Sequence, residues 1–312
     1  MEKVLVTGGA GFIGSHIVDK LLEEGYEVAV FDNLSTGKLE NLRDKAYTFY
    51  EGDITNKEQL YGAVADFQPH YIIHQAAQVS VAKSVENMEE DARINIMGSI
   101  NVINAAKDYG VKKIVYASSA AVYGEPQYLP IDENHPINPQ SPYGISKFSV
   151  ELYLKVAHEL YGIDYTILRY ANVYGPRQDV KGEGGVVAIF AEKIANEETP
   201  TIFGDGEQTR DFVYVTDVAT ANVLAIQGGR NKIFNISTNT ITNINYLLNL
   251  INRTFHKEIT PIYEEERKGD IKSSVLNNKS SKEALNWEPR ISIEEGIDKI
   301  AEYYNKMNKI HI

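Results

Sequence analysis

The sequence contains no cysteine, and this absence removes several kinds of chemistry at once. Without thiols there is no disulfide framework, no thiolate metal site and no cysteine nucleophile. The chain also begins directly with the apolar run of a strand, MEKVLV, rather than with the pattern of a secretory signal. Both features favour a cytoplasmic protein that takes its reactive groups from hydroxyl, phenol, amine or carboxylate side chains.

Long hydrophobic runs and an excess of positive charge are missing as well. No apolar run approaches the roughly 20 residues of a membrane-spanning helix, so no membrane partner is expected. The 31 Lys and Arg residues are outnumbered by 43 Asp and Glu residues, which gives a net charge of −12. Because phosphate neutralisation needs a basic face, we expect no general nucleic-acid binding. A local cationic pocket for a nucleotide remains compatible with this balance.

The first half of the chain alternates short apolar runs with helical patterns. The near-continuous hydrophobicity of the runs favours parallel strands covered on both faces, joined by right-handed helical crossovers. The sequence therefore predicts an α/β fold with a doubly wound, Rossmann-like parallel sheet. The expected strands are 4–6, 28–31, 47–50, 71–73 and 113–116, and the expected helices are 12–24, 57–67, 85–108 and 142–161.

The second part of the chain has shorter elements, separated by loops with Gly, Pro, Asp and Arg. Residues 211–226 and 234–236 are expected to return to the first domain as a strand, a helix and a strand. The predicted division assigns 1–168 and 211–237 to a dinucleotide-binding domain and 169–210 and 238–312 to a smaller, discontinuous α/β substrate domain. The loops are expected to gather over the carboxyl edge of the sheet, where doubly wound folds bind ligands.

Three glycines lie between the first expected strand and the first expected helix, at Gly8, Gly11 and Gly14. In such a motif the first permits a tight turn, the second lets the backbone approach a pyrophosphate, and the third allows close helix–strand packing. Asp32 ends the second strand at the position of the acid that binds an adenosine ribose. Its carboxylate would repel a 2′-phosphate, which favours NAD over NADP. The alternative is a turn role in Asp32-Asn33.

A phenol and an amine four residues apart, Tyr143 and Lys147, begin the helix expected at 142–161, so they share one face of it. Lowering the pKa of a phenol from about 10 to near 7 requires roughly 4 kcal/mol. A helix N-terminus supplies about 0.3–1 kcal/mol, so the Lys147 cation and a positive nicotinamide ring must supply most of it. Ser118-Ser119 ends an upstream strand and offers hydroxyls. The alternative is a buried tyrosine with a surface lysine.

The histidines do not indicate a metal site. His70 and His74 have the spacing of a helical ligand pair, but the residues between them have a strand pattern. Residues four apart on a strand lie about 13 Å apart. No metal is therefore expected.

Several longer motifs occur in a fixed order along the chain. They are TGGAGFIG, Asp32-Asn33, HQAAQ at 74–78, SSAAVYG at 118–124, YGISK at 143–147, LRYANVYGP at 168–176, GEQTRD at 206–211 and RKGD at 267–270. Together they resemble the extended short-chain dehydrogenase/reductase family, over essentially the whole chain. Within that family the match is similar to the nucleotide-sugar 4-epimerases of the UDP-glucose 4-epimerase type.

This resemblance implies an isomerase that inverts C4 of a UDP-sugar through a transient 4-keto sugar. Ser119 is implied to hold the sugar 4-hydroxyl with Ser118 as a helper, while Tyr143, supported by Lys147, removes the proton. The implied NAD site comprises Gly8, Gly11, Phe12, Ile13, Gly14, Asp32, Asn33, Ser35, Gly37, Asp53, Ile54, Gln75, Ala76, Ala77, Gln78, Asn95, Ser118, Tyr143, Lys147 and Tyr170. The implied substrate site comprises Lys83, Ser118, Ser119, Tyr143, Asn172, Val187, Phe203, Arg210, Arg267, Asp270 and Ser274.

Two places in the motifs bear on the reaction and the substrate. Related dehydratases and decarboxylases carry acidic or polar residues where this chain has Ala120 and Ala121, and methyl groups cannot shuttle the proton that elimination requires. Ser274 occupies the position of the gatekeeper beside the sugar 2-substituent, where a tyrosine would restrict the pocket. Serine predicts interconversion of UDP-GlcNAc and UDP-GalNAc, preferred or shared with UDP-glucose and UDP-galactose. A one-residue slip to Ser273 leaves the side chain small.

Other interpretations remain open. A UDP-glucose-only or UDP-glucuronate 4-epimerase is the second enzyme hypothesis, although a carboxylated sugar needs a further cation that the sequence does not locate. An NAD-binding regulator without catalysis is the alternative from another class. Helices 85–108 and 142–161 carry apolar residues beyond those that face the sheet, and the family commonly pairs these helices, so a homodimer is expected.

Overall fold

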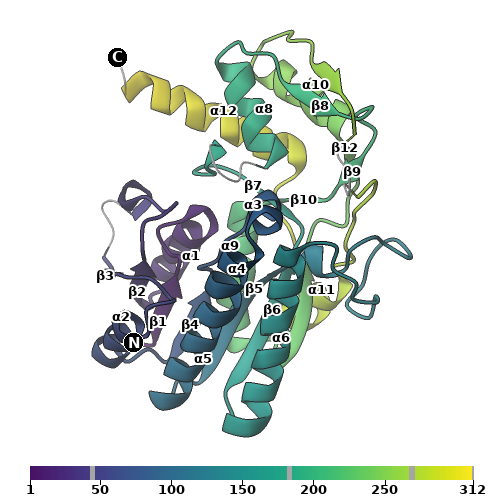
Figure 1. The fold of residues 1–312 in the computed structure, drawn as a ribbon. Coiled ribbons are helices and arrows are strands. Elements are labelled where there is room, and N and C mark those ends of the chain that lie inside the picture. The colour runs from purple at the N-terminus through teal and green to yellow at the C-terminus, as the bar shows by residue number, and fades with distance from the viewer. Residues whose placement is uncertain (43–45, 181–184, 267–270, 311–312) are drawn as a thin grey trace.

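The structure is a computed structural model that describes residues 1–42, 46–180, 185–266 and 271–310. A seven-stranded sheet of order β11-β6-β5-β4-β1-β2-β3 forms its centre, and every neighbouring pair is parallel (Figure 1). The strands are β1 Lys3–Thr7, β2 Glu27–Asp32, β3 Thr48–Glu51, β4 Tyr71–His74, β5 Lys113–Ser119, β6 Asp164–Tyr170 and β11 Lys232–Ile236. The order reverses between β1 and β4. The predicted doubly wound fold is confirmed.

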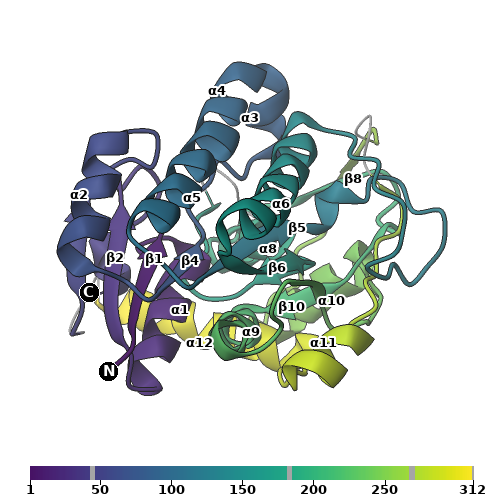
Figure 2. The same ribbon diagram turned by 90° about the horizontal axis from the view of Figure 1, so that it is seen from below.

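Helices cover both faces of this sheet (Figure 2). One face buries apolar side chains of α1 (Phe12–Glu23) and α9 (Val215–Gln227). The other face is covered by α2 (Lys57–Phe67), α5 (Gly98–Asp108) and α6 (Pro142–Tyr161). Strand side chains alternate between the two cores: Val4 and Val6 belong to the first and Leu5 to the second. This two-sided burial explains the continuous apolar runs of the strands.

The helix expected over 85–108 is interrupted, which corrects the sequence prediction. The structure has α3 (Val81–Glu86), α4 (Met88–Ala92), a π-helical turn (Arg93–Met97) and then α5. The interruption lies at Asn87, which leaves the helical conformation with φ −146° and ψ 84°. Its side chain accepts a hydrogen bond from the backbone N–H of Glu90 and caps α4. Asparagine competes with helix continuation in this way, because its short amide reaches nearby backbone groups.

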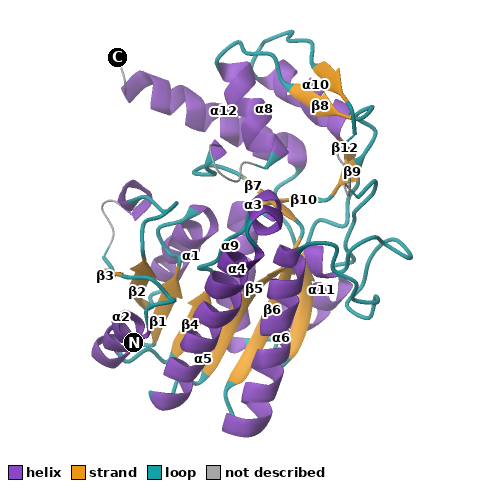
Figure 3. Ribbon diagram, viewed as in Figure 1, coloured by secondary structure: helices purple, strands orange, loops and turns teal. Residues whose placement is uncertain are grey.

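A smaller group of elements lies over the carboxyl edge of the sheet (Figures 1 and 3). It contains α8 (Val186–Ala195), α10 (Ile244–Thr254) and α12 (Ile293–Ile310), which bury a core of their own. Three short ladders accompany them: β7 (Asn172–Tyr174) with β10 (Phe212–Tyr214), β8 (Thr201–Phe203) with β13 (Ile262–Glu264), and β9 (Thr209–Arg210) with β12 (Thr242–Asn243). Helix α11 (Lys279–Leu285) instead packs near β11 and α9.

The segment expected to return to the first domain does so only in part. Helix α9 and strand β11 belong to the central sheet and its cover, as predicted. Strand β10 does not join that sheet, because it pairs with β7 in a separate two-stranded ladder. In the part of the chain that the structure describes, no helix is both long and apolar enough to cross a membrane.

Candidate active site

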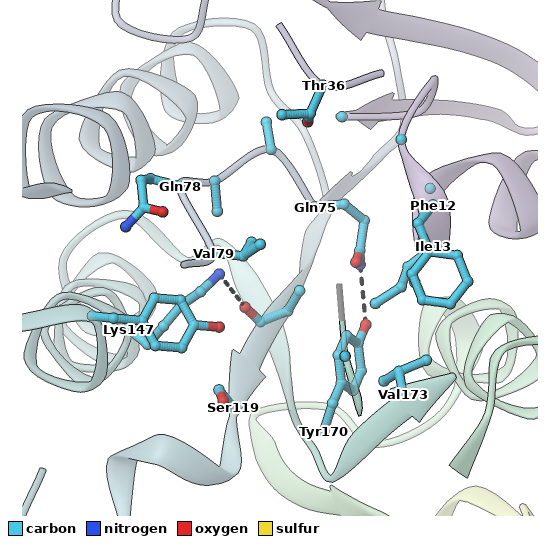
Figure 4. Close-up of a pocket in the computed structure, with 18 of the residues that line it drawn as sticks. Phe12, Ile13, Thr36, Gln75, Gln78, Val79, Ser119, Lys147, Tyr170 and Val173 are labelled. Carbon is cyan, nitrogen blue, oxygen red and sulfur yellow. Dashed lines mark hydrogen bonds between the residues drawn. The ribbon is translucent and has the colours of Figure 1, made fainter. Parts of the chain in front are cut away.

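A cavity of about 990 Å³ lies at the carboxyl edge of the central sheet, lined by strand ends and by segments of the smaller group of elements. Figure 4 shows Lys147 and Ser119 on one side of it and Phe12, Ile13, Tyr170 and Val173 on the other. The structure brings together at this cavity the following predicted site residues: Gly8, Gly11, Phe12, Ile13, Gly14, Asp32, Asn33, Ser35, Gly37, Asp53, Ile54, Gln75, Ala76, Ala77, Gln78, Lys83, Ser118, Ser119, Tyr143, Lys147, Tyr170, Asn172, Val187, Arg210 and Ser274.

Of the predicted site residues that the structure describes, Asn95 and Phe203 are not among those that line the cavity. Arg267 and Asp270 lie outside the described residues. Phe203 ends β8, and its carbonyl oxygen accepts a hydrogen bond from Gln208 at 2.7 Å. Asn95 is buried in the π-helical turn, where its side chain bonds both backbone groups of Gln78 at 2.8 and 2.9 Å. Asn95 therefore positions the Gln78 segment from behind instead of lining the cavity.

The glycine loop has the geometry that the motif predicts. Gly8 adopts φ +71°, and a Cβ there would lie 2.7 Å from the backbone nitrogen of Ala76. A Cβ at Gly14 would lie 2.1 Å from the Gly8 carbonyl oxygen, so a side chain at either position would force the backbone apart. Gly11 is the N-cap of α1, and a Cβ there would lie 3.2 Å from the carbonyl oxygen of Gly8. This cavity-lining helix N-terminus fits a dinucleotide pyrophosphate.

Asp32 makes the turn contact that was one of its two interpretations, and it also lines the cavity. Its Oδ1 accepts from the backbone N–H of Leu34 at 2.8 Å, which is a turn contact, and its Oδ2 accepts from Ala10 at 2.9 Å. Burial raises the pKa of Asp32, and these two hydrogen bonds oppose that rise. A carboxylate has about four acceptor positions, so two remain for a ligand hydroxyl. The side chain is thus fixed by the loop and still able to bind a ribose.

Asp53 lies beside Asn33 at the same end of the cavity. Its Oδ2 accepts from Asn33 at 2.9 Å, and its Oδ1 accepts from the Thr55 hydroxyl and backbone. Burial would raise the pKa of Asp53, but these hydrogen bonds outweigh it and the pKa lies below its ordinary value. The carboxylate stays ionised and tied to the segments after β2 and β3.

The lysine at the opposite end of the cavity is held by the sheet. Lys147 is 3% exposed, and its Nζ donates to the carbonyl oxygen of Ala117 in β5 at 2.9 Å. The same Nζ lies 5.8 Å from the ring centroid of Tyr143 and 5.2 Å from that of Tyr116. Helix α6 is capped by the Ser141 hydroxyl, with Pro142 in its first turn, which fixes where Tyr143 and Lys147 fall. A buried cation beside a phenol stabilises the phenolate form.

The two serines that end β5 have different hydrogen-bond partners. The Ser119 hydroxyl accepts a hydrogen bond from Ala121 N–H at 3.2 Å at the start of a short 3₁₀ turn, η3 (Ala120–Val122). The Ser118 hydroxyl instead donates to the carboxylate of Glu151 at 2.6 Å, in a buried environment. Ser118 also lines the cavity, so its role as a helper at the sugar hydroxyl stays a prediction. Successive strand side chains point to opposite faces, which is why the two hydroxyls have different partners.

Two polar networks beneath the cavity were missed by sequence reasoning. Glu151 forms a doubly hydrogen-bonded ion pair with Arg169 of β6, with distances of 2.9 and 2.6 Å and both side chains buried. Asn222 of α9 bonds the Tyr170 hydroxyl at 2.8 Å, and Gln75 bonds the same hydroxyl at 3.1 Å (Figure 4). Glu151 could have been predicted to lie near the site, because it is one helical turn beyond Lys147. No feature of the sequence indicates the role of Asn222.

The two histidines of the strand pattern have separate partners. His74 is buried between the Thr7 hydroxyl at 2.7 Å and the Ser99 hydroxyl at 2.8 Å. Burial, with a contribution from the Lys147 charge, lowers the pKa of His74 to about 3, so its ring is neutral. His70 accepts from the backbone N–H of Lys3 at 3.0 Å. Within the described residues, no group of three or more His, Cys, Asp or Glu side chains could hold a metal ion.

Comparison with known proteins shows the family of the chain. The sequence profile of the NAD dependent epimerase/dehydratase family matches residues 4–237. The chain belongs to this family. A UDP-glucose 4-epimerase of Mycolicibacterium smegmatis is 41% identical over 314 residues, which cover 98% of this chain and all of that protein.

Solved structures of family members superpose over almost the whole chain. A crystal structure of a UDP-glucose 4-epimerase of Thermotoga maritima with UDP-glucose matches with a TM-score of 0.96 and 48% identity, covering 98% of this chain and 99% of that one. A UDP-N-acetylglucosamine 4-epimerase of Methanobrevibacter ruminantium in complex with UDP-N-acetylmuramic acid matches with a TM-score of 0.93 and 38% identity. It covers 98% of this chain and 99% of its own.

Proposed function

We propose that this protein is an isomerase that inverts C4 of UDP-sugars through a transient 4-keto sugar, with NAD as a resident cofactor. The proposal rests on one observation: Ser119, Tyr143 and Lys147 line the same cavity as the glycine loop and Asp32. One cavity of this kind offers a hydroxyl, a phenol and a cation at one end and a dinucleotide cradle along the rest. The similarity to UDP-sugar epimerases over the whole chain supports the same proposal.

The chain's own residues supply the acid–base part of the reaction. Bound NAD would accept the C4 hydride and return it. Ser119 holds the sugar 4-hydroxyl, and Tyr143 takes its proton during oxidation and gives it back during reduction. Lys147 stabilises the phenolate and is oriented by its hydrogen bond to Ala117. Proton and hydride both return to the sugar, so the reaction leaves no net oxidation.

The cavity lining favours epimerisation over loss of water. Elimination needs an acid that protonates the leaving hydroxyl, and the turn after Ser119 carries the methyl groups of Ala120 and Ala121. The acidic side chains among the described lining residues are Asp32, Asp53, Glu90 and Asp179. Each is engaged elsewhere: Asp32 with backbone N–H groups, Asp53 with Thr55 and Asn33, Glu90 with Arg93, and Asp179 with Lys38.

We further propose UDP-GlcNAc and UDP-GalNAc as substrates, preferred or shared with UDP-glucose and UDP-galactose. Ser274 lines the cavity and is half-buried, with its backbone N–H bonded to the Thr209 carbonyl oxygen at 3.2 Å. A serine at this position leaves space for an N-acetyl group. Arg210, Asn172 and Val187 line the cavity and would bind the UDP part, since a guanidinium pairs well with diphosphate oxygens.

A homodimer and the division into domains also remain our proposals. Helix α6 exposes an apolar row at helical spacing, made of Ile145, Leu152, Tyr153, Val156 and Leu160. Val85 and Met88 are exposed on the neighbouring helices α3 and α4. Such a row suits a helix-to-helix contact between two copies. We keep the division at 1–168 with 211–237 and 169–210 with 238–312, and a cytoplasmic location, as predictions.

The direct test uses the purified protein with UDP-GlcNAc and with UDP-glucose in parallel, without added NAD. Proton NMR of the sugar H4 and H1 signals should show UDP-GalNAc and UDP-galactose accumulating to equilibrium. Tyr143→Phe serves as the matched control, because it removes one oxygen and the acid–base group with it. Failure of the wild-type protein to invert any UDP-hexose at C4 would overturn the proposal. Inversion of UDP-glucuronate instead would favour the second enzyme hypothesis.

A further inference from the structure

Building on the proposed function, we propose that residues 175–179 form a clasp that Arg177 and Asp19 fasten to α1, and that this clasp retains NAD between turnovers. Arg177 and Asp19 are thus positioning residues for the bound dinucleotide. The clasp follows β7, and its members Arg177, Gln178 and Asp179 line the cavity. The opposite end of the contact is α1, whose first residues line the same cavity.

Three hydrogen bonds join the clasp to α1. The Nη1 of Arg177 donates to Asp19 Oδ2 at 2.8 Å and to Ser15 Oγ at 3.2 Å. The Pro176 carbonyl oxygen can only accept, so His16 Nε2 donates to it, at 3.1 Å. The side chains of Arg177 and Asp19 are 24% and 25% exposed, so solvent screens this pair less than a surface pair. Asp19, His16 and Ser15 lie within the two turns of α1 that follow the glycine loop.

The backbone of the clasp has an uncommon conformation, which these hydrogen bonds stabilise. Arg177 has φ +69°, in the left-handed region that a residue with a side chain seldom adopts. Such a conformation persists where surrounding contacts determine it. Gly175 has φ +148°, and a Cβ there would lie 2.6 Å from the side chain of Val215. The turn therefore bends the chain away from β7 and directs Arg177 onto α1.

A weaker contact joins the clasp to the loop after β2. Lys38 Nζ and Asp179 Oδ1 lie 3.8 Å apart, and their side chains are 60% and 37% exposed. Lys38 is itself attached to the glycine loop, because its N–H donates to the Ala10 carbonyl oxygen at 3.0 Å. An exposed pair at this distance contributes little and is screened by salt. We assign the main retention to Arg177 and Asp19, and a salt-dependent part to Lys38 and Asp179.

Retention matters for the chemistry of an epimerase. The hydride leaves the sugar and must return to that same sugar, so the cofactor ends each turnover as it began. If the reduced cofactor left in mid-cycle, an oxidised sugar would remain without a reductant. The cavity wall that the clasp completes would therefore be closed during turnover, whereas a dehydrogenase must open to exchange its cofactor.

The test measures how long NAD stays bound, separately from activity. Wild type, Arg177→Asn and Asp19→Asn are loaded with NAD and desalted, and the NAD remaining per chain is followed with time by acid release and chromatography. Asparagine tolerates a left-handed backbone, so the first variant removes the guanidinium without adding strain. We expect both variants to lose NAD about tenfold faster or more, because each breaks a hydrogen-bonded charged pair. Arg177→Lys should retain NAD for an intermediate time.

Lys20→Ala is the matched control. Lys20 lies on α1 next to Asp19 but pairs with Glu23 and Glu24 on the helix surface, so its loss should leave the NAD residence time unchanged. Melting temperatures of the NAD-free proteins separate retention from general destabilisation. An unchanged residence time in both Arg177→Asn and Asp19→Asn, or an equal loss in Lys20→Ala, would refute the clasp. A wild type that retains NAD but inverts no UDP-sugar would instead refute the proposed function and leave the clasp standing.

Discussion

Lys147 Nζ lies 5.8 Å from the ring centroid of Tyr143, and a hydrogen bond of 2.9 Å to the Ala117 carbonyl oxygen fixes it there. The cation is thus oriented by strand β5 while the phenol is carried by helix α6. Sheet and helix are packed together through a buried core, so the distance between the two groups does not depend on a mobile loop. Catalysis by the phenol should depend on this fixed cation.

Lys147→Met should lower activity at neutral pH by about a hundredfold or more, the usual contribution of a positioned acid–base group. The cation favours the phenolate, so its removal makes the phenolate rarer near neutrality and restores it only at higher pH. The pH–rate profile of C4 inversion should therefore move to the alkaline side. A variant that loses activity equally at every pH would show that Lys147 acts in some other way.

Ser274→Tyr should abolish turnover of UDP-GlcNAc and spare that of UDP-glucose. The added ring would fill cavity space beside the sugar 2-substituent, where an acetamide is larger than a hydroxyl. The measurement is kcat/KM for both substrates, and Ser273→Tyr one residue earlier is the control for position. Equal loss on both substrates in Ser274→Tyr would refute the gatekeeper interpretation.

Glu151→Ala should destabilise the fold by about 3–5 kcal/mol, because it leaves the buried Arg169 charge without its partner. Glu151→Ala/Arg169→Met removes both charges and should recover part of that loss. Denaturant unfolding of the two proteins measures the difference in free energy. Glu283→Ala provides an exposed control in α11, because its pair with Lys279 is a surface pair. Loss of less than about 1 kcal/mol in Glu151→Ala would contradict a buried pair.

Lys113 should make stability rise at alkaline pH. Burial lowers the pKa of Lys113 to about 8, although Asp164 opposes the shift. The folded pKa lies below the unfolded value of about 10.4, so between these values the unfolded chain binds more protons and the free energy of unfolding increases with pH. From pH 8 to pH 10 wild type should gain roughly 2 kcal/mol relative to Lys113→Met. Parallel pH dependence of the two proteins would count against this.

Disruption of the apolar row on α6 should yield a monomer. Leu152→Asp with Val156→Asp places two charges within a row of exposed apolar side chains, and a helix-to-helix contact cannot bury them unpaired. Sedimentation velocity of the wild type should give a dimer and that of the double variant a monomer. Ile262→Asp alters an equally exposed apolar residue in β13 and should leave the dimer intact. A monomeric wild type would refute the dimer proposal.

Periodicity and local motifs were sufficient to predict the first five strands, the glycine loop and the start of α6. These features depend on neighbours in sequence: an apolar run, a positive φ at Gly8, and a serine cap before Pro142. The break at Asn87 was missed because one capping side chain overrides a helical pattern that continues on both sides. The hydrogen bond from Ser118 to Glu151 was not predicted, because the two residues are 33 positions apart in the sequence.

The remaining features could not be predicted, because they depend on contacts between residues far apart in the sequence. Arg177 and Asp19 are 158 residues apart, and no spacing in the chain relates them. Strand β10 has the apolar pattern of a sheet strand, yet its partner is β7 and not the central sheet. Pattern predicts that a strand exists, whereas its partner is decided by where the whole chain folds.

The buried imidazole of His74 gives the centre of the sheet a fixed direction of hydrogen donation. The Asn95 carbonyl oxygen can only accept a hydrogen bond, so the Ser99 hydroxyl donates to it, with 2.5 Å between the two oxygens. The Ser99 oxygen then accepts a hydrogen bond from Nε2–H of His74, and Nδ1 of the ring accepts one from the Thr7 hydroxyl. One tautomer alone satisfies this relay from the end of β1 to the π-helical turn. A second proton on the ring would oppose the Thr7 hydroxyl hydrogen, so the relay is oriented one way for as long as the sheet is folded.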